Sequence, residues 1–115
     1  PMSECLFCKI RQGEIPADII FENDDVLAFN DVNPQAPVHL LIIPKKHIST
    51  VNDMVDDDQL IMGKLFSAAR AIAKQKGVSD DGYRLVVNCN EKAGQTVFHI
   101  HMHMLADRAL TWPPG

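Results

Sequence analysis

Three of the five histidines in this sequence stand at alternate positions near its C-terminal end. They are His99, His101 and His103, and single apolar residues separate them. Successive side chains of a strand point to opposite faces, so a strand here would align the three imidazoles on one face, about 7 Å apart. Aligned histidines are costly to bury without partners. The spacing therefore indicates either metal ligation or catalysis in which one histidine attacks and its neighbours orient it or move protons.

A second group of reactive side chains lies near the N-terminus, where Cys5 and Cys8 form a Cys-x-x-Cys pair. Three cysteines do not make a disulfide framework, and such a pair in a cytosolic protein more often binds metal or does redox chemistry. Tetrahedral zinc takes four ligands, and two cysteines with two histidines are a common structural set. The alternative is a reduced, metal-free pair packed under the first helix. We expect Cys89, alone in a predicted strand, to be a small buried hydrophobe.

The residues just before the histidine row could bind phosphate oxygens. Gly94, Gln95 and Thr96 supply a flexible backbone, a carboxamide and a hydroxyl, and Asn88 could supply another amide donor. Such donors suit phosphate, although a short glycine-containing loop is a weak signal by itself.

A long helix over 57–76 is the clearest of the elements that must position these groups. Three consecutive aspartates, at 56–58, complement the positive end of its dipole, and Gly77 follows as a stop. Its apolar residues recur at three- and four-residue spacing, which is typical of a helix with one buried face. That predicted face consists of Ile61, Leu65, Ala68, Ala69 and Ile72.

The remaining predicted elements are shorter. Ser3 is expected to cap a helix that runs to about Gln12, where Gly13 ends it. Most connections between the predicted strands are too short for a helical crossover, so the sheet should be mainly antiparallel. We expect a single α+β domain over 1–115, with about five strands, one long helix and one short helix. Apolar runs bounded by turn residues predict strands over 19–22, 26–29, 39–43, 83–89 and 97–105.

Composition limits the partners and the location. The chain has 115 residues, 46% of them hydrophobic and 23% charged, with a formal net charge of −4. These fractions argue against disorder, and the mild acidity argues against a nucleic-acid partner, which would require clustered Lys and Arg. The one basic pair, Lys45-Lys46, is expected to be a solvated strand end. No apolar run approaches the ~20 residues of a membrane span, and no signal peptide is recognisable after Pro1-Met2, so we expect a cytoplasmic protein without membrane contact.

The histidine row and several blocks around it resemble one family. His99 to Leu105 matches the His-x-His-x-His-x-x signature of the histidine triad (HIT) superfamily, in which x is hydrophobic. The signature alone is moderately specific, and with further blocks in order over nearly the whole chain it is very specific. The further blocks resemble the Hint branch and include Phe7-Cys8-Lys9-Ile10, 28–37, Pro44-Lys45-Lys46-His47-Ile48, Gly94-Gln95-Thr96-Val97 and Trp112-Pro113-Pro114-Gly115.

The resemblance implies an enzyme. Hint proteins are homodimeric hydrolases of nucleoside 5′-phosphoramidates, especially adenosine monophosphoramidates. By this resemblance His101 attacks the α-phosphorus and forms a nucleotidyl-histidine, from which water releases the nucleoside monophosphate. His103 would contact the phosphate, and His39 would orient the nucleophile or relay protons. No organic cofactor is expected.

The resemblance also implies the other site residues. Cys5 and Cys8, completed by His47 and His99, would hold a structural zinc ion, as in relatives that keep the cysteine pair. Asp31 would accept hydrogen bonds from the ribose, and hydrophobic residues that would otherwise be ordinary core would sandwich the base. The tail over 106–115 would carry one residue toward the partner subunit's site. The full nucleotide-binding set is Phe7, Ile10, Phe29, Asp31, Val32, Asn88, Gly94, Gln95, Thr96, Val97, His103 and Trp112.

Three other functions remain open from the sequence. One is a dinucleoside polyphosphate hydrolase of the same superfamily, although the short length and the Trp-Pro-Pro-Gly ending favour the Hint branch. Another is a nucleotide-binding regulatory or scaffold protein in which hydrolysis is incidental. The third is a purely structural zinc module without hydrolytic activity.

Overall fold

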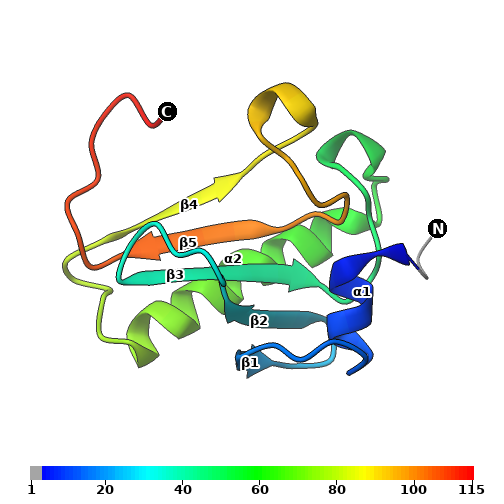
Figure 1. Cartoon of the computed structure of the whole chain (residues 1–115), viewed down its shortest axis with the longest axis horizontal. Coiled ribbons are helices and arrows are strands. Elements are labelled where there is room, and N and C mark those ends of the chain that lie inside the picture. Colours follow the sequence, from blue (N-terminus) through cyan, green and yellow to red (C-terminus); the bar gives the residue numbers. More distant parts are fainter. Residues whose placement is uncertain (1–3) are drawn as a thin grey trace.

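A five-stranded antiparallel sheet forms the centre of the protein (Figure 1). The computed structural model describes residues 4–115. The strands lie in the order β1-β2-β3-β5-β4, so β1 and β4 are the edges. The predicted α+β class with a mainly antiparallel sheet is confirmed. The elements are α1 (Leu6–Arg11), β1 (Ile19–Glu22), β2 (Val26–Asn30), β3 (Val38–Pro44), α2 (Asp58–Gln75), β4 (Tyr83–Val87) and β5 (Met102–Ala106), with single 3-10 turns at Val51–Asp53 and Glu91–Ala93.

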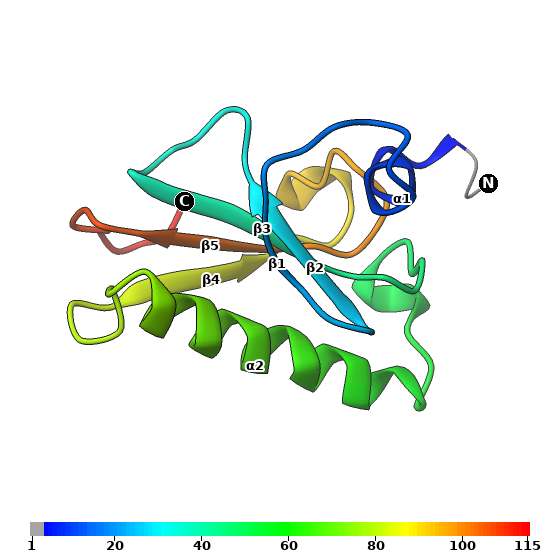
Figure 2. The ribbon, with the colours of Figure 1, turned by 90° about the horizontal axis from the view of Figure 1, so that it is seen from below.

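Each face of the sheet is covered by one helix. Figure 2 shows α2 along one face and α1 above the other, together with the loops that follow β2 and β4. Because side chains alternate along a strand, β3 serves both cores. Leu40 and Ile42 lie in the cluster beneath α2, whereas Leu41 and Ile43 lie in the cluster beneath α1. Burial on both faces explains why this strand reads as a continuous apolar run.

The predicted long helix is confirmed as α2. Its apolar face is buried as expected at Leu65, Ala68, Ala69 and Ile72, and Ile61 is half-buried. None of the helices within residues 4–115 has the length and apolar character of a membrane span.

The basic pair before α2 is solvated as predicted at Lys46, whose side chain is 51% exposed, but both lysines also form ion pairs. Nζ of Lys46 lies 2.6 Å from Oδ1 of the buried Asp58 at the start of α2. Lys45 pairs with Glu22 at 2.7 Å. The other oxygen of Asp58 accepts the backbone N–H of Val55 at 2.9 Å. Both interactions favour the carboxylate and hold the pKa of Asp58 below its ordinary value. The pair therefore ties the end of β3 to β1 and α2.

The predicted strand over 97–105 is wrong in its first half. β5 begins only at Met102, which pairs with Ile42 on one side and Val87 on the other. Before that point β4 offers no partner, because it ends at Val87, whereas β3 continues to Pro44. Residues 97–101 nevertheless leave the ladder. The N–H of Ile100 instead donates to the carbonyl of Ile48 at 2.7 Å. Two of the three aligned histidines therefore lie on irregular backbone beyond the sheet.

The remaining boundaries differ by a few residues. β4 ends at Val87 rather than at residue 89. The first helix begins at Leu6 with Cys5 as its N-cap, and the predicted cap, Ser3, lies outside the described residues. Gly13 follows α1 with φ of +80°, a conformation that suits glycine and ends the helix as predicted.

Replacing Leu65 by Ala should destabilise the fold by about 2–5 kcal/mol, because it leaves a cavity between α2 and the sheet. Leu65 is 1% exposed and belongs to the main core cluster. The same substitution at Leu60, which is 70% exposed on the same helix, should change stability by about 0.5 kcal/mol or less. Chemical denaturation of the two variants measures both values. Equal losses would contradict this packing of α2.

Candidate functional site: a histidine network beneath helix α1

Four of the five histidines gather on the α1 side of the sheet. His39 projects from β3 and His103 from β5, and their ring centroids are 5.2 Å apart. The ring of His101 lies 5.1 Å from that of His103. His39, His99 and His101 are buried, and His103 is half-buried. The expectation that the histidine row shares one face therefore agrees with these spacings, although only His103 lies on a strand.

The tautomer of His101 is set by a main-chain carbonyl. Its Nδ1–H donates to the carbonyl oxygen of His99 at 2.8 Å, so the neutral ring keeps an unprotonated Nε2. Phe7 packs edge-on against the same ring at 5.1 Å. Burial lowers the pKa of His101, although its hydrogen bond to His99 opposes that shift. The ring is thus a neutral imidazole whose free lone pair is available as a nucleophile.

A second hydrogen-bonded chain sets the tautomer of His103. The backbone N–H of Gln35 donates to Nδ1 of His39 at 2.9 Å, so the proton of the neutral His39 ring must be on Nε2. That nitrogen lies 2.9 Å from Nδ1 of His103 and can donate to it. Nδ1 of His103 is then an acceptor, and the proton of this ring is on Nε2. His103 therefore offers an N–H donor to a ligand.

Burial keeps His103 uncharged. Desolvation, together with the neighbouring His101 and His39, lowers the pKa of His103 to about 4. The carboxylate of Asp31 acts in the opposite direction. At neutral pH the donor that His103 offers is consequently a neutral imidazole N–H.

Asp31, His39 and His103 bring three ligand-type atoms within 4.8 Å of one another, yet their proton arrangement does not suit a metal. A metal on Nε2 of His39 would require a ring without a proton at either nitrogen, because its Nδ1 already accepts the Gln35 N–H. A neutral imidazole always carries one N–H. The group is a hydrogen-bonded relay.

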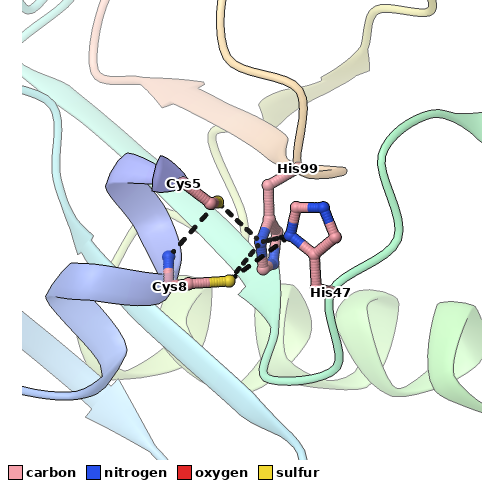
Figure 3. A group of neighbouring side chains, drawn as sticks. All are labelled: Cys5, Cys8, His47 and His99. Carbon is pink, nitrogen blue, oxygen red and sulfur yellow. Dashed lines mark hydrogen bonds between the residues drawn. The ribbon is translucent and has the colours of Figure 1, made fainter. Parts of the chain in front are cut away.

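Cys5, Cys8, His47 and His99 converge between α1, the turn after β3 and the segment before β5 (Figure 3). His99 is fully buried, and its Nε2–H donates to the carbonyl of Pro44 at 2.8 Å, so its Nδ1 is unprotonated. Nδ1 lies 3.4 Å from Sγ of Cys5 and 3.6 Å from Sγ of Cys8. It lies 3.2 Å from Nδ1 of His47. Burial lowers the pKa of His99 to about 4, which favours the neutral form that ligates metals.

These four side chains fit a tetrahedral zinc ion. Zn–N bonds of about 2.0 Å and Zn–S bonds of about 2.3 Å imply separations of about 3.3–3.8 Å between tetrahedral ligand atoms. The separations around His99 Nδ1 match that range within a few tenths of an ångström. The hydroxyl of Ser49 lies 3.3 Å from Nε2 of His47 and supplies an outer partner of the kind that metal-bound histidines use. In the absence of metal, burial and the neighbouring Cys5 raise the pKa of Cys8 to about 11, so metal binding would release its proton.

The residues predicted to bind the nucleoside line one cavity of about 470 Å³ beside α1. Phe7 and Phe29 meet there edge to face, with their centroids 5.4 Å apart. Asp31 lies at the rim, and the side chain of Val32 is fully exposed. Phe7, Ile10 and Phe29 also belong to the core cluster beneath α1, so the core and pocket interpretations both apply. Asn30, next to Asp31, also lines the cavity. Further lining residues that the sequence did not single out are Leu6, Ile15, Pro16, Ala17, Asp18 and Leu41.

The predicted phosphate loop is held mainly by Gln95, whose side chain faces inward. Its Oε1 accepts the N–H of Asn90 at 2.7 Å, and its Nε2 donates to the carbonyls of Ser49 and Val97 at 2.9 and 3.1 Å. A buried carboxamide with these three partners supports the loop and has little capacity left for a ligand. Thr96 is exposed.

Gly94 and Asn88 come together at the edge of this loop. Gly94 has φ of +98°, and Nδ2 of Asn88 lies 3.9 Å from where a Cβ on Gly94 would stand. Trp112, in the tail, is 81% exposed and does not line the cavity beside α1.

Comparisons with known proteins identify the family of the chain. The family model for the HIT domain matches residues 12–110. This chain belongs to the HIT domain family. It is 49% identical over 107 residues to the purine nucleoside phosphoramidase of Escherichia coli, covering 93% of this chain and 90% of that protein. It is 50% identical to an uncharacterized HIT-like protein of Synechococcus elongatus, covering 99% and 100% of the two chains.

Solved structures give the same result for the fold. A HIT family hydrolase from Legionella pneumophila superimposes with a TM-score of 0.95 at 56% identity, over 97% of this chain and all of that one. A histidine triad nucleotide-binding protein from Candida albicans superimposes with a TM-score of 0.81 at 30% identity, over 96% and 83% of the two chains. The fold expected from the resemblance is therefore confirmed.

Sequence reasoning missed the groups that orient the HIT histidines. They are the N–H of Gln35 and the carbonyls of Pro44 and His99. Backbone groups occur at every position, so no residue type marks them. Ser49 was also missed, and its position two residues after His47 was the signal that could have revealed it.

The stability of this HIT domain should fall as the pH is lowered from about 6.5 to about 4. An unfolded histidine titrates near pH 6.5, whereas burial lowers the pKa of His103 to about 4, so the unfolded chain binds more protons in this window. The contribution of His103 is complete above pH 6.5 and is lost toward pH 4. His103→Gln should reduce proton uptake on unfolding at pH 5 by about one proton. Denaturation midpoints of both proteins, measured across this pH range, test the prediction. If the midpoint of the variant depends on pH as steeply as that of the unmodified protein, a neutral His103 is contradicted.

Proposed function

We propose that this protein hydrolyses purine nucleoside 5′-phosphoramidates, such as an adenosine monophosphoramidate, and releases the nucleoside monophosphate. The observation that carries the proposal is the unprotonated Nε2 of His101, held by the 2.8 Å hydrogen bond of its Nδ1–H to His99. The aromatic ring of Phe7 contacts His101 and also lines the nucleoside cavity, so the nucleophile and the cavity are adjacent. The name of the relative from Escherichia coli supports the substrate class.

In the proposed reaction, Nε2 of His101 attacks the phosphorus and forms a P–N bond to the enzyme. The P–N bond to the leaving amine breaks, and the amine takes up a proton from solvent as it departs. Water then attacks the phosphorus and returns a proton to solvent, the bond to His101 breaks, and the second product is the nucleoside monophosphate. The covalent intermediate on His101 thus divides one difficult displacement at phosphorus into two easier ones.

The neutral His103 has a specific part in this proposal. Its Nε2–H donor faces the same side of the sheet as His101 and would donate to a phosphate oxygen, since the relay from Gln35 through His39 holds the proton there. Asn88 and the backbone near Thr96 would supply further neutral donors. The base would lie between Phe7, Ile10, Phe29 and Val32, and the ribose hydroxyls would bind Asp31.

We propose a structural zinc ion on Cys5, Cys8, His47 and His99. Bound there, the ion would hold α1, the turn after β3 and the segment before β5 together, and it would take no part in the chemical steps. Its ligands are close to the proposed site, because Phe7 lies between the two cysteines in the sequence and His99 supplies the carbonyl that orients His101.

We further propose a homodimer in which a second copy pairs along β4. This strand is an edge of the sheet, and all five of its residues are half-buried or exposed. Unpaired edges of this kind readily accept another strand. Exposed apolar side chains nearby in the sequence, Val87 and Phe98, would be covered, and the tail with Trp112 would approach the partner's site.

Replacing His101 by Ala should reduce turnover of an adenosine phosphoramidate by about 10³-fold or more, because the nucleophile is lost. Binding of the nucleoside monophosphate should stay within a few-fold of the unmodified protein. Steady-state kinetics and calorimetry measure the two quantities. Labelled adenylate should be trapped on the unmodified protein and absent from the variant.

Turnover retained by the His101 variant would contradict the covalent route. A higher rate on a diadenosine polyphosphate than on the phosphoramidate would instead favour the dinucleoside polyphosphate branch. Tight nucleotide binding with no measurable turnover of either would favour a regulatory protein.

Cys8→Ser should lower the zinc content from about one ion per chain to a small fraction of that value, since a tetrahedral site loses one of four ligands. Cys89→Ser is the matched control and should keep the metal, because Cys89 lies outside the cluster. Elemental analysis of protein prepared without chelator measures both. Absence of zinc from the unmodified protein, also after exposure to zinc salts, would contradict the site.

A further inference from the structure

Asp31 lies at the junction of the nucleoside cavity and the histidine relay. It lines the cavity beneath α1. Its Oδ1 accepts the N–H of Asn33 at 2.8 Å, which holds the carboxylate in place. Its Oδ2 lies 3.3 Å from Nε2 of His39, the nitrogen that also lies 2.9 Å from Nδ1 of His103. The carboxylate of Asp31 therefore lies beside the place expected for the ribose and also beside the hydrogen-bonded relay from Gln35 through His39 to His103.

The one N–H of His39 is donated to His103, and the carboxylate of Asp31 lies close to it. Because the Gln35 N–H occupies Nδ1, the N–H of His39 is on Nε2, where it can hydrogen-bond to Nδ1 of His103 at 2.9 Å. Oδ2 of Asp31 lies 3.3 Å from the same nitrogen and competes for the proton through its charge. The buried ring of His39 has no solvent competing for that proton. Any share of the hydrogen bond that goes to Asp31 is lost to His103. When His103 loses this donor, nothing in the relay prevents its proton from moving to Nδ1, and Nε2 then has no proton to offer a phosphate.

We propose that Asp31 couples ribose recognition to the readiness of His103: ribose hydroxyls that donate to Asp31 weaken its competition for the N–H of His39, and the hydrogen bond from His39 to His103 is thereby strengthened. This inference rests on the proposed function, which places the ribose at Asp31. It makes Asp31 a positioning residue for the phosphate chemistry in addition to a ribose ligand. The ribose becomes a determinant of kcat, whereas a simple binding contact would affect only KM.

The first test observes the proton directly. Protein with ¹⁵N-labelled histidine is titrated with adenosine, which has the ribose but no phosphate that could itself order His103. The expected result is a shift of His103 toward a single Nε2–H tautomer, reported by its two ring nitrogen resonances. Saturation with 2′,3′-dideoxyadenosine should leave the His103 resonances as in the free protein.

The two possible failures are distinguishable. If adenosine does not perturb the resonances of Phe7 and Phe29, the proposed nucleoside site is wrong. If adenosine perturbs those aromatic rings but leaves the His103 tautomer unchanged, the site stands and the coupling is overturned.

The second test uses kinetics with adenosine 5′-phosphoramidate and its 2′,3′-dideoxy analogue. In the unmodified protein the analogue should show a kcat lower by about three- to tenfold, the effect of weakening one hydrogen bond. In Asp31→Ala the competing acceptor is gone, so kcat should be the same for both substrates while KM for the ribose substrate rises. The coupling would be overturned if the analogue changed only KM in the unmodified protein. It would also be overturned if Asp31→Ala kept the same kcat ratio between the two substrates as the unmodified protein.

Asp18→Ala is the matched control. Asp18 lines the same cavity, but its carboxylate accepts from Nδ2 of Asn30 at 2.7 Å and is not among the partners of His39. The variant should keep the kcat ratio of the unmodified protein between the two substrates. Loss of the ratio in this variant as well would show that any negative charge in the cavity suffices, which contradicts a role through His39.

Discussion

The organisation of the site depends on His99, a fully buried histidine whose three polar groups each hold a different part of the chain. Its Nε2–H donates to Pro44 at the end of β3, and its Nδ1 faces the two cysteines at the start of α1 and His47. Its carbonyl oxygen accepts the hydrogen bond from Nδ1–H of His101. A buried polar group left without a partner would cost several kcal/mol, so these contacts constrain one another. His99 therefore connects the proposed metal cluster, through its ring, with the proposed nucleophile, through its carbonyl.

Burial also explains how a mildly acidic protein could provide the proposed phosphate site. The imidazoles of His101 and His103 are held neutral because desolvation lowers their pKa values. A hydrogen bond at Nδ1 then fixes the tautomer of each ring. Nδ1–H of His101 donates to His99, which leaves a free lone pair on Nε2, whereas Nδ1 of His103 accepts from His39, which leaves an N–H on Nε2. The site therefore offers neutral donors and a neutral nucleophile, and it requires no basic surface.

The sheet topology brings the two halves of the site together. β3 and β5 are neighbours although a long helix and β4 separate them in the sequence, so His39 and His103 meet in the middle of the sheet. α1 covers the same face and supplies both the cysteines and the aromatic wall of the nucleoside cavity. A change in the position of α1 would consequently affect the cavity and the metal cluster together.

The sequence by itself determined the α+β class, the helix α2 and the residue types of the site, because periodicity, capping and the order of motifs are local properties. It also placed the histidine row on one face, but it began the last strand too early, since the start of β5 depends on its partners, and β4 ends at Val87 opposite Met102. Only the tertiary structure decided that Gln95 supports its loop, that Lys46 pairs with Asp58, and which ring nitrogens carry protons. These outcomes depend on which backbone carbonyl or amide lies beside a side chain. Every residue carries such groups, so their positions come from the fold and not from the residue type.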